Sequence, residues 1–139
     1  MSRSSIRREI RKYERLKSES EERLRKLEED LEHLLDFRSR YESGKQEFDN
    51  NLNHRRNRAD SAEDMSENIK CGQGYYEGMN QDLTGEKNSK AMYYVERVSE
   101  RIESVRKLLE HEIEVEKQRI HDYSERIEEL YRRLSREDD

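Results

Sequence analysis

The chain has 139 residues, of which 45% are charged and 29% hydrophobic, and it contains no proline and no tryptophan. A typical soluble domain has roughly 25% charged and roughly 45–50% apolar residues, so this composition excludes a compact domain with a core of ordinary thickness. The 29 basic and 34 acidic residues are interleaved and give a net charge of −5, which argues against the uniformly basic face of a nucleic-acid-binding protein.

The first predicted element is a long amphipathic helix over residues 4–68. Its apolar residues recur in steps of three and four, a spacing that disordered chains do not sustain. Ser4 or Ser5 is the predicted N-cap, and Gly44 predicts a local bend near residues 38–45. Lys17 and Ser20 occupy positions of the same phase, and the stripe weakens beyond residue 34. The apolar members of this predicted seam are Ile6, Ile10, Tyr13, Leu24, Leu27, Leu31, Leu34, Tyr41, Phe48 and Leu52.

The predicted connection covers residues 69–87 and contains Gly and Tyr residues together with Cys71, the only cysteine. A zinc site needs about four converging ligands, and the four histidines are scattered over both helices. A nucleophilic cysteine would need a neighbouring base and an orienting group, and no such arrangement is recognisable. The sequence therefore predicts no catalytic residue, no metal ligand and no cofactor.

The second predicted helix covers residues 88–136 and begins near Ser89. Its apolar spacing contains a step of four, from Leu109 to Ile113, where a step of three is due, and such a stutter locally unwinds a supercoil. The apolar residues of its predicted seam are Val95, Val98, Ile102, Val105, Leu109, Ile113, Ile120, Tyr123, Ile127, Leu130 and Leu134.

Two stripes of similar length predict an all-α fold, an elongated, coiled-coil-like antiparallel hairpin of two helices in a single domain over residues 1–139. In this pairing Ile6 and Ile10 lie against the end that contains Leu130 and Leu134. The N-terminal segment lacks the apolar region of a signal peptide, and no stretch approaches the ~18 apolar residues of a membrane span.

Several apolar residues lie beside the predicted seam or near the turn and are candidates for partner binding. Leu16, Leu35 and Leu108 are left over by a two-helix seam and need a third or fourth helix. Tyr93 and Tyr94 follow the turn, where they either form a contact surface or close the end of the hairpin. Leu83 and Gly85 belong to the same predicted region.

The segment Leu83-Thr84-Gly85, followed by Ala91 and by Tyr93 or Tyr94, resembles the turn of WXG-type helical hairpins of type VII secretion. More specifically, the chain resembles the small YwqH-like proteins that accompany LXG toxins, over its whole length as architecture. The Trp of the motif is missing. The Tyr/Phe-x-x-x-Asp/Glu export tail is missing too, because Tyr123 is followed four residues later by Ile127, and Tyr131 by Ser135.

The resemblance implies a non-enzymatic targeting chaperone that binds the helical N-terminal domain of an LXG-type toxin, with a second small helical protein as an additional partner. It implies location in the bacterial cytoplasm, and it leaves open whether the chain is exported together with its partner. The alternative is a self-associating coiled-coil spacer or scaffold protein, such as a homodimer. Residue patterns support neither an enzyme nor a nucleic-acid-binding protein.

Overall fold

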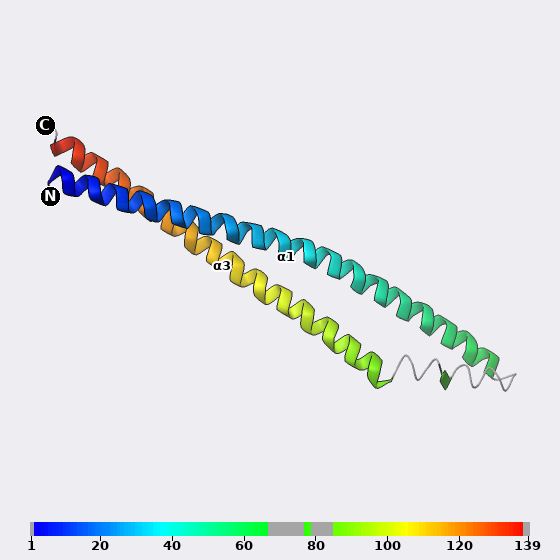
Figure 1. Cartoon of the computed structure of the whole chain (residues 1–139). Coiled ribbons are helices and arrows are strands. Elements are labelled where there is room, and N and C mark those ends of the chain that lie inside the picture. Colours follow the sequence, from blue (N-terminus) through cyan, green and yellow to red (C-terminus); the bar gives the residue numbers. More distant parts are fainter. Residues whose placement is uncertain (1, 67–76, 79–84, 138–139) are drawn as a thin grey trace. The chain divides into compact units, whose positions relative to one another are not determined.

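The computed structural model describes residues 2–66, 77–78 and 85–137, and these contain two long helices and no strand. Helix α1 covers Arg3–Ser66 and helix α3 covers Glu86–Glu137 (Figure 1). The predicted all-α helical hairpin is confirmed. The predicted end of the first helix, residues 67–68, lies outside the described residues, whereas α3 begins two residues earlier than predicted.

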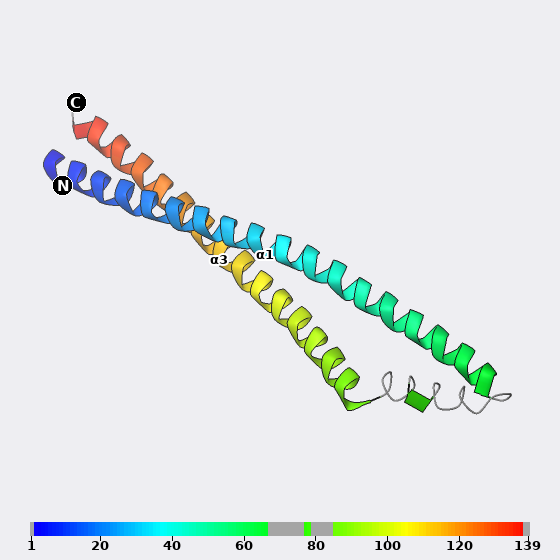
Figure 2. The ribbon, with the colours of Figure 1, turned by 45° about the vertical axis from the view of Figure 1, so that its right-hand side comes forward.

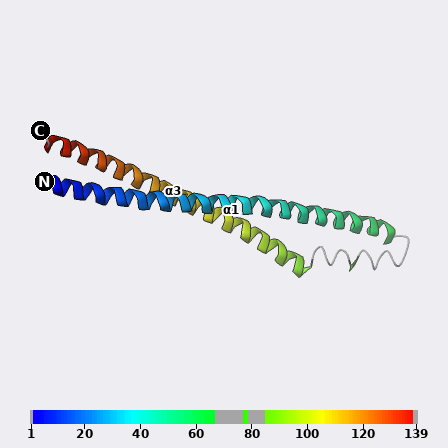
Figure 3. The same ribbon diagram turned by 45° about the horizontal axis from the view of Figure 1, so that its top comes forward.

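The two helices contribute to two compact units, which we call the terminal unit (residues 1–34 and 104–139) and the central unit (residues 35–103). In the terminal unit the helices run antiparallel, with the first turns of α1 beside the last turns of α3 (Figures 1, 2 and 3). This arrangement follows from the apolar stripe of each helix, which can leave water only against another stripe.

The core of the terminal unit contains Ile6, Ile10 and Leu130, each exposed by 4% or less. Tyr13 and Leu134 pack against this cluster and are partly buried. The pairing predicted for this end of the hairpin is therefore confirmed.

The seam continues along α1 with the predicted phase. Leu24, Leu27, Leu31 and Leu34 are half-buried, and their neighbours on the outer face are exposed. Ser20, a polar residue in the same phase, is fully buried at 0% exposure.

On α3, half-buried or buried positions include the predicted seam residues Ile102, Val105, Leu109, Ile113, Ile120, Ile127 and Leu134. Val98 departs from the predicted seam because it is 37% exposed, whereas the neighbouring Ser99 is half-buried. Glu116 is buried between Ile113 and Ile120. The buried or half-buried positions 109, 113, 116 and 120 therefore step by four, three and four. The step from Leu109 to Ile113 is thus followed by a charged seam residue, which the apolar pattern alone does not show.

The helices of the central unit also contact each other. The Tyr41 hydroxyl donates a hydrogen bond of 2.5 Å to the carbonyl oxygen of Val95. Arg38 forms an ion pair of 3.3 Å with Glu103. These polar contacts accompany a seam in which α1 has few apolar residues, as predicted for the region beyond residue 34.

The two helix starts differ in their caps. The backbone N–H of Ser5 donates to Ser2 Oγ at 3.2 Å, and the backbone N–H of Ile6 donates to the Ser2 carbonyl at 3.0 Å. Ser2 is therefore the N-cap of α1, and the prediction of Ser4 or Ser5 as the N-cap is wrong. At the start of α3 the Ser89 N–H donates to the Gly85 carbonyl at 3.2 Å.

Neither helix has, in its described residues, a segment long and apolar enough to cross a membrane.

Candidate functional site

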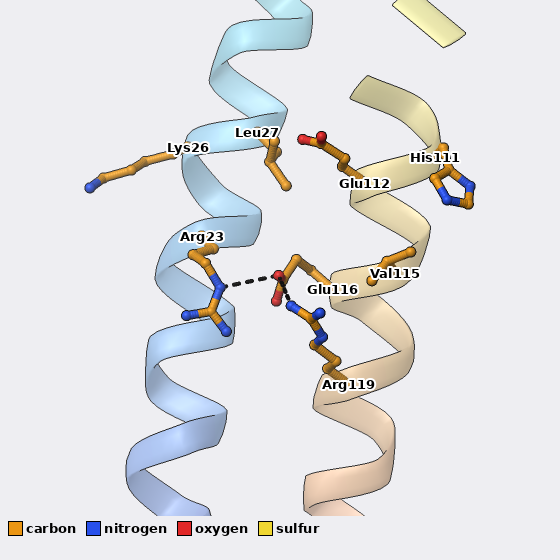
Figure 4. Close-up of a pocket in the computed structure, with 8 residues that line it drawn as sticks. All are labelled: Arg23, Lys26, Leu27, His111, Glu112, Val115, Glu116 and Arg119. Atoms are coloured by element: carbon orange, nitrogen blue, oxygen red, sulfur yellow. Dashed lines mark hydrogen bonds and ion pairs between the residues drawn. The ribbon is translucent and has the colours of Figure 1, made fainter. Parts of the chain in front are cut away.

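A layer of charged and polar side chains interrupts the apolar seam of the terminal unit. Glu116 of α3 is 5% exposed and lies across the seam from Ser20 of α1. Arg23 Nε donates to Glu116 Oε1 at 3.1 Å, and Arg119 Nη1 donates to the same oxygen at 2.7 Å (Figure 4). Arg23 Nη2 also donates to Ser20 Oγ at 2.9 Å. The layer thus joins both helices through one carboxylate oxygen.

The surroundings of Glu116 keep its carboxylate ionised. Burial raises the pKa of this carboxyl, but hydrogen bonds from Arg23 and Ser20, together with the charges of Arg23 and Arg119, lower the pKa by more. The net result is a pKa below the usual value of a glutamate. At neutral pH the group is therefore a hydrogen-bond acceptor only.

The second oxygen of the same carboxylate has no partner. Oε2 of Glu116 is buried and accepts no hydrogen bond from any described residue. A buried acceptor without a donor is uncommon, because its desolvation is not compensated. The buried Ser20, whose hydroxyl hydrogen-bonds this carboxyl and lowers its pKa, belongs to the same layer, so a structural role of the layer accounts for the buried carboxylate.

An open depression of about 480 Å³ lies next to this layer, between α1 and α3 of the terminal unit, and we call it the groove (Figure 4). Leu27 and Val115 supply its apolar lining, and both are half-buried. The residues that line the groove are Arg23, Lys26, Leu27, His111, Glu112, Val115, Glu116 and Arg119. Apolar and hydrogen-bonding groups therefore face the same hollow, which is the pattern of a recognition surface.

The predicted partner-binding residues of the first and second helices differ in exposure. Leu16 and Leu35 are half-buried, and Leu108 is 55% exposed. Leu108 lies seven residues before Val115 and thus on the same face of α3 as the groove lining. Leu16 lies one residue before a seam position of α1, as do Arg23 and Lys26, so it belongs to the same side of the terminal unit. Leu35 lies one residue after a seam position, on the other flank of α1.

The candidates near the turn belong to the central unit. Tyr93 is 58% exposed and Tyr94 is 65% exposed, and their rings meet edge to face with centroids 5.8 Å apart. The guanidinium of Arg97 lies 5.8 Å from the centroid of the Tyr93 ring. Gly85 is half-buried at the start of α3, whereas Leu83 and Cys71 lie outside the described residues.

Residues 2–66, 77–78 and 85–137 contain no group of three or more His, Cys, Asp or Glu that could hold a metal ion. The groove contains His111, Glu112 and Glu116, but Glu116 is occupied by two arginines.

No family model, no curated protein and no solved structure matches the chain.

Ser20 and Glu116 are among the site residues that the sequence pattern did not single out as functional. Ser20 had a usable signal, because it occupies a strict seam position although it is polar. Glu116 also falls in phase, three residues after Ile113 and four before Ile120. A search for polar residues at in-phase positions of both helices would have found the pair.

Proposed function

We propose that this chain is a non-enzymatic protein that binds another helical protein through apolar side chains left beside its two-helix seam. The observation that carries the proposal is the exposure of large apolar and aromatic residues in a chain that has few of them. These residues are Phe37, Met92, Tyr93, Tyr94, Val98, Leu108 and Tyr131, with exposed fractions between 37% and 65%. Exposed apolar residues on paired helices are covered when further helices complete a bundle.

The finer proposal concerns the identity of the partner. The resemblance of Leu83-Thr84-Gly85 and the following tyrosines to the turn of WXG-type hairpins favours the N-terminal helical domain of an LXG-type toxin. The antiparallel helices of the terminal unit are compatible with this class of protein. The chain would then act as a targeting chaperone of type VII secretion in the bacterial cytoplasm.

A self-associating scaffold is the second candidate, because the same exposed residues can be covered by another copy of the chain. The two candidates differ in what the purified chain does alone. A scaffold forms a stable homo-oligomer without help, whereas a targeting chaperone forms its stable complex only with its partner.

Co-expression with the N-terminal domain of an LXG-type toxin tests the proposal. We expect the tagged chain to co-purify with that domain and the variant Leu108→Glu to lose most of the complex, since a charge would enter an apolar contact. Lys107→Glu is the matched control, because it places the same charge on the next exposed residue. Absence of a complex with the unmodified chain would refute the toxin assignment.

The tyrosines need a separate variant. Tyr93→Ala combined with Tyr94→Ala removes two exposed rings without touching the core. We expect weaker co-purification with unchanged helicity in circular dichroism. Complex formation equal to that of the unmodified chain would exclude these tyrosines from the binding surface.

A further inference from the structure

Helix α1 has a short basic face in the central unit. The residues from Asn50 to Ala59 include three arginines and one histidine and no acidic residue. Arg55, Arg56 and Arg58 are exposed, and no hydrogen bond or ion pair joins any of them to another described residue. Three positive charges therefore face water without compensation from the fold, in a chain whose net charge is −5.

The fold offers no partner to two of these arginines. Other arginines are paired along one turn of their helix, as Arg25 is with Glu22 at 2.7 Å, and acidic residues interrupt the run of arginines at residues 7–15. The positions three and four residues from Arg55 and Arg58 hold only Asn, Leu, His, Ala, Ser and the other arginine. Neither guanidinium can therefore form the ion pairs that stabilise a solvated helix face.

These two arginines share an open depression of about 320 Å³ with Asn51 and His54. Positions 51, 54, 55 and 58 step by three, one and three, so all four residues lie on one face of α1. Each guanidinium can bind a carboxylate through two parallel N–H donors, and the Asn51 carboxamide supplies a further N–H. The face thus suits anionic groups that are spaced about one helical turn apart.

The extent of the face indicates which anion fits it. Asp49 and Asp60 are exposed at its two ends, so the backbone of an RNA would meet carboxylates beyond about three helical turns. A membrane surface would need apolar side chains beside the arginines, and the exposed residues within 50–58 are Asn, His and Arg only. A short row of carboxylates on a partner helix matches both the length and the charge of the face.

We propose that Arg55 and Arg58 bind an acidic row, made of Asp or Glu residues three or four positions apart, on a helix of the partner protein. The proposal rests on the proposed function and adds to it an electrostatic contact in the central unit. Exposed charges of this kind act mainly on the association rate and on its salt dependence. The contact therefore selects partners by their charge.

An alanine-based helical peptide with three glutamates in steps of four and three serves as the probe, and the same peptide with glutamines is its neutral counterpart. Fluorescence anisotropy measures the binding of each peptide to the full chain. We expect the Glu peptide to bind about tenfold more tightly in low salt and to lose most of this preference near about 0.5 M salt, where screening is strong. Arg55→Ala combined with Arg58→Ala should abolish the preference, with unchanged helicity in circular dichroism.

Arg56→Ala is the matched control, because it removes the same charge from a side chain that projects about 100° around the helix from Arg55. Arg56 also has an acidic residue, Asp60, four positions along the helix. The control should change the affinity for the Glu peptide by less than about threefold, since one exposed charge contributes little.

Equal affinity for the two peptides, an unchanged preference in the double variant, or an equal loss in Arg56→Ala would each overturn the proposal. Single-stranded RNA and phosphatidylserine vesicles are the competing probes. Tighter binding of either than of the Glu peptide, lost in the same double variant, would identify a different occupant and overturn the proposal too.

Two further results separate this inference from the proposed function. A toxin-domain complex that is lost in Leu108→Glu but keeps its affinity and salt dependence in the double arginine variant would overturn the acidic contact and leave the partner function standing. Binding of the Glu peptide by a chain that forms no complex with the toxin domain would support the arginine face and refute the toxin assignment alone.

Discussion

Replacing Leu130 by alanine removes the best-covered side chain of the core. Leu130 is 0% exposed and packs with Ile6 and Ile10, while Tyr13 and Leu134 border the cluster. The lost transfer free energy is about 0.8 kcal/mol for each buried methylene, and a cavity term adds to it. Leu→Ala substitutions in protein cores cost about 2–5 kcal/mol. We expect about 2–3 kcal/mol here, because a pair of helices relaxes around the gap more easily than a thick core.

Urea unfolding followed by circular dichroism at 222 nm measures this loss. The matched control is Leu108→Ala, which truncates the same type of residue where it is 55% exposed and should change the free energy of unfolding by about 0.5 kcal/mol or less. Equal effects of the two substitutions would refute the packing of Leu130 against the start of α1.

Three further predictions concern single residues. Gly44 lies inside α1, and a Cβ placed on it would meet no atom within 4 Å. Gly44→Ala should therefore raise the free energy of unfolding by about 0.5–1 kcal/mol in the same urea assay. A decrease in the free energy of unfolding would contradict an unbroken helix at this position. Tyr41→Phe removes the hydrogen bond to the Val95 carbonyl and should cost about 1 kcal/mol; no loss would argue against this contact between the helices. The folded-state pKa of Glu116 lies below its usual value, so its contribution to stability is present above about pH 4.5 and is lost as the pH falls through the folded-state pKa. Glu116→Gln should therefore flatten the acid side of the curve of melting temperature against pH, and a curve as steep as that of the unmodified chain would exclude Glu116 as a contributor.

The fold could be predicted from the sequence because its main determinant is periodic. The steps of three and four in α1 predicted that Leu24, Leu27, Leu31 and Leu34 face the same side, and all four are half-buried. The same spacing extends through polar residues, since Arg38 and Lys45 are half-buried as well. Phase, rather than apolar character alone, decides which side of the helix faces its neighbour.

The ionic layer could not be predicted from apolar residues, because it depends on a contact between distant parts of the chain. Glu116 can occupy the seam only because Arg23, 93 residues earlier in the sequence, donates to it from the opposite helix. Val98 shows the converse, since its apolar character predicted burial and its position in the helix leaves it 37% exposed. Side-chain type and helix phase conflict at these positions, and the packing of α1 against α3 resolves the conflict.

Sedimentation equilibrium, on the purified chain alone and after co-expression with the N-terminal domain of an LXG-type toxin, tests the central claim most directly. We expect a stable mixed complex whose mass includes both proteins, and no equally stable homo-oligomer of the chain alone. A tight homodimer with full helicity, unchanged by the toxin domain, would contradict the partner function and favour the scaffold.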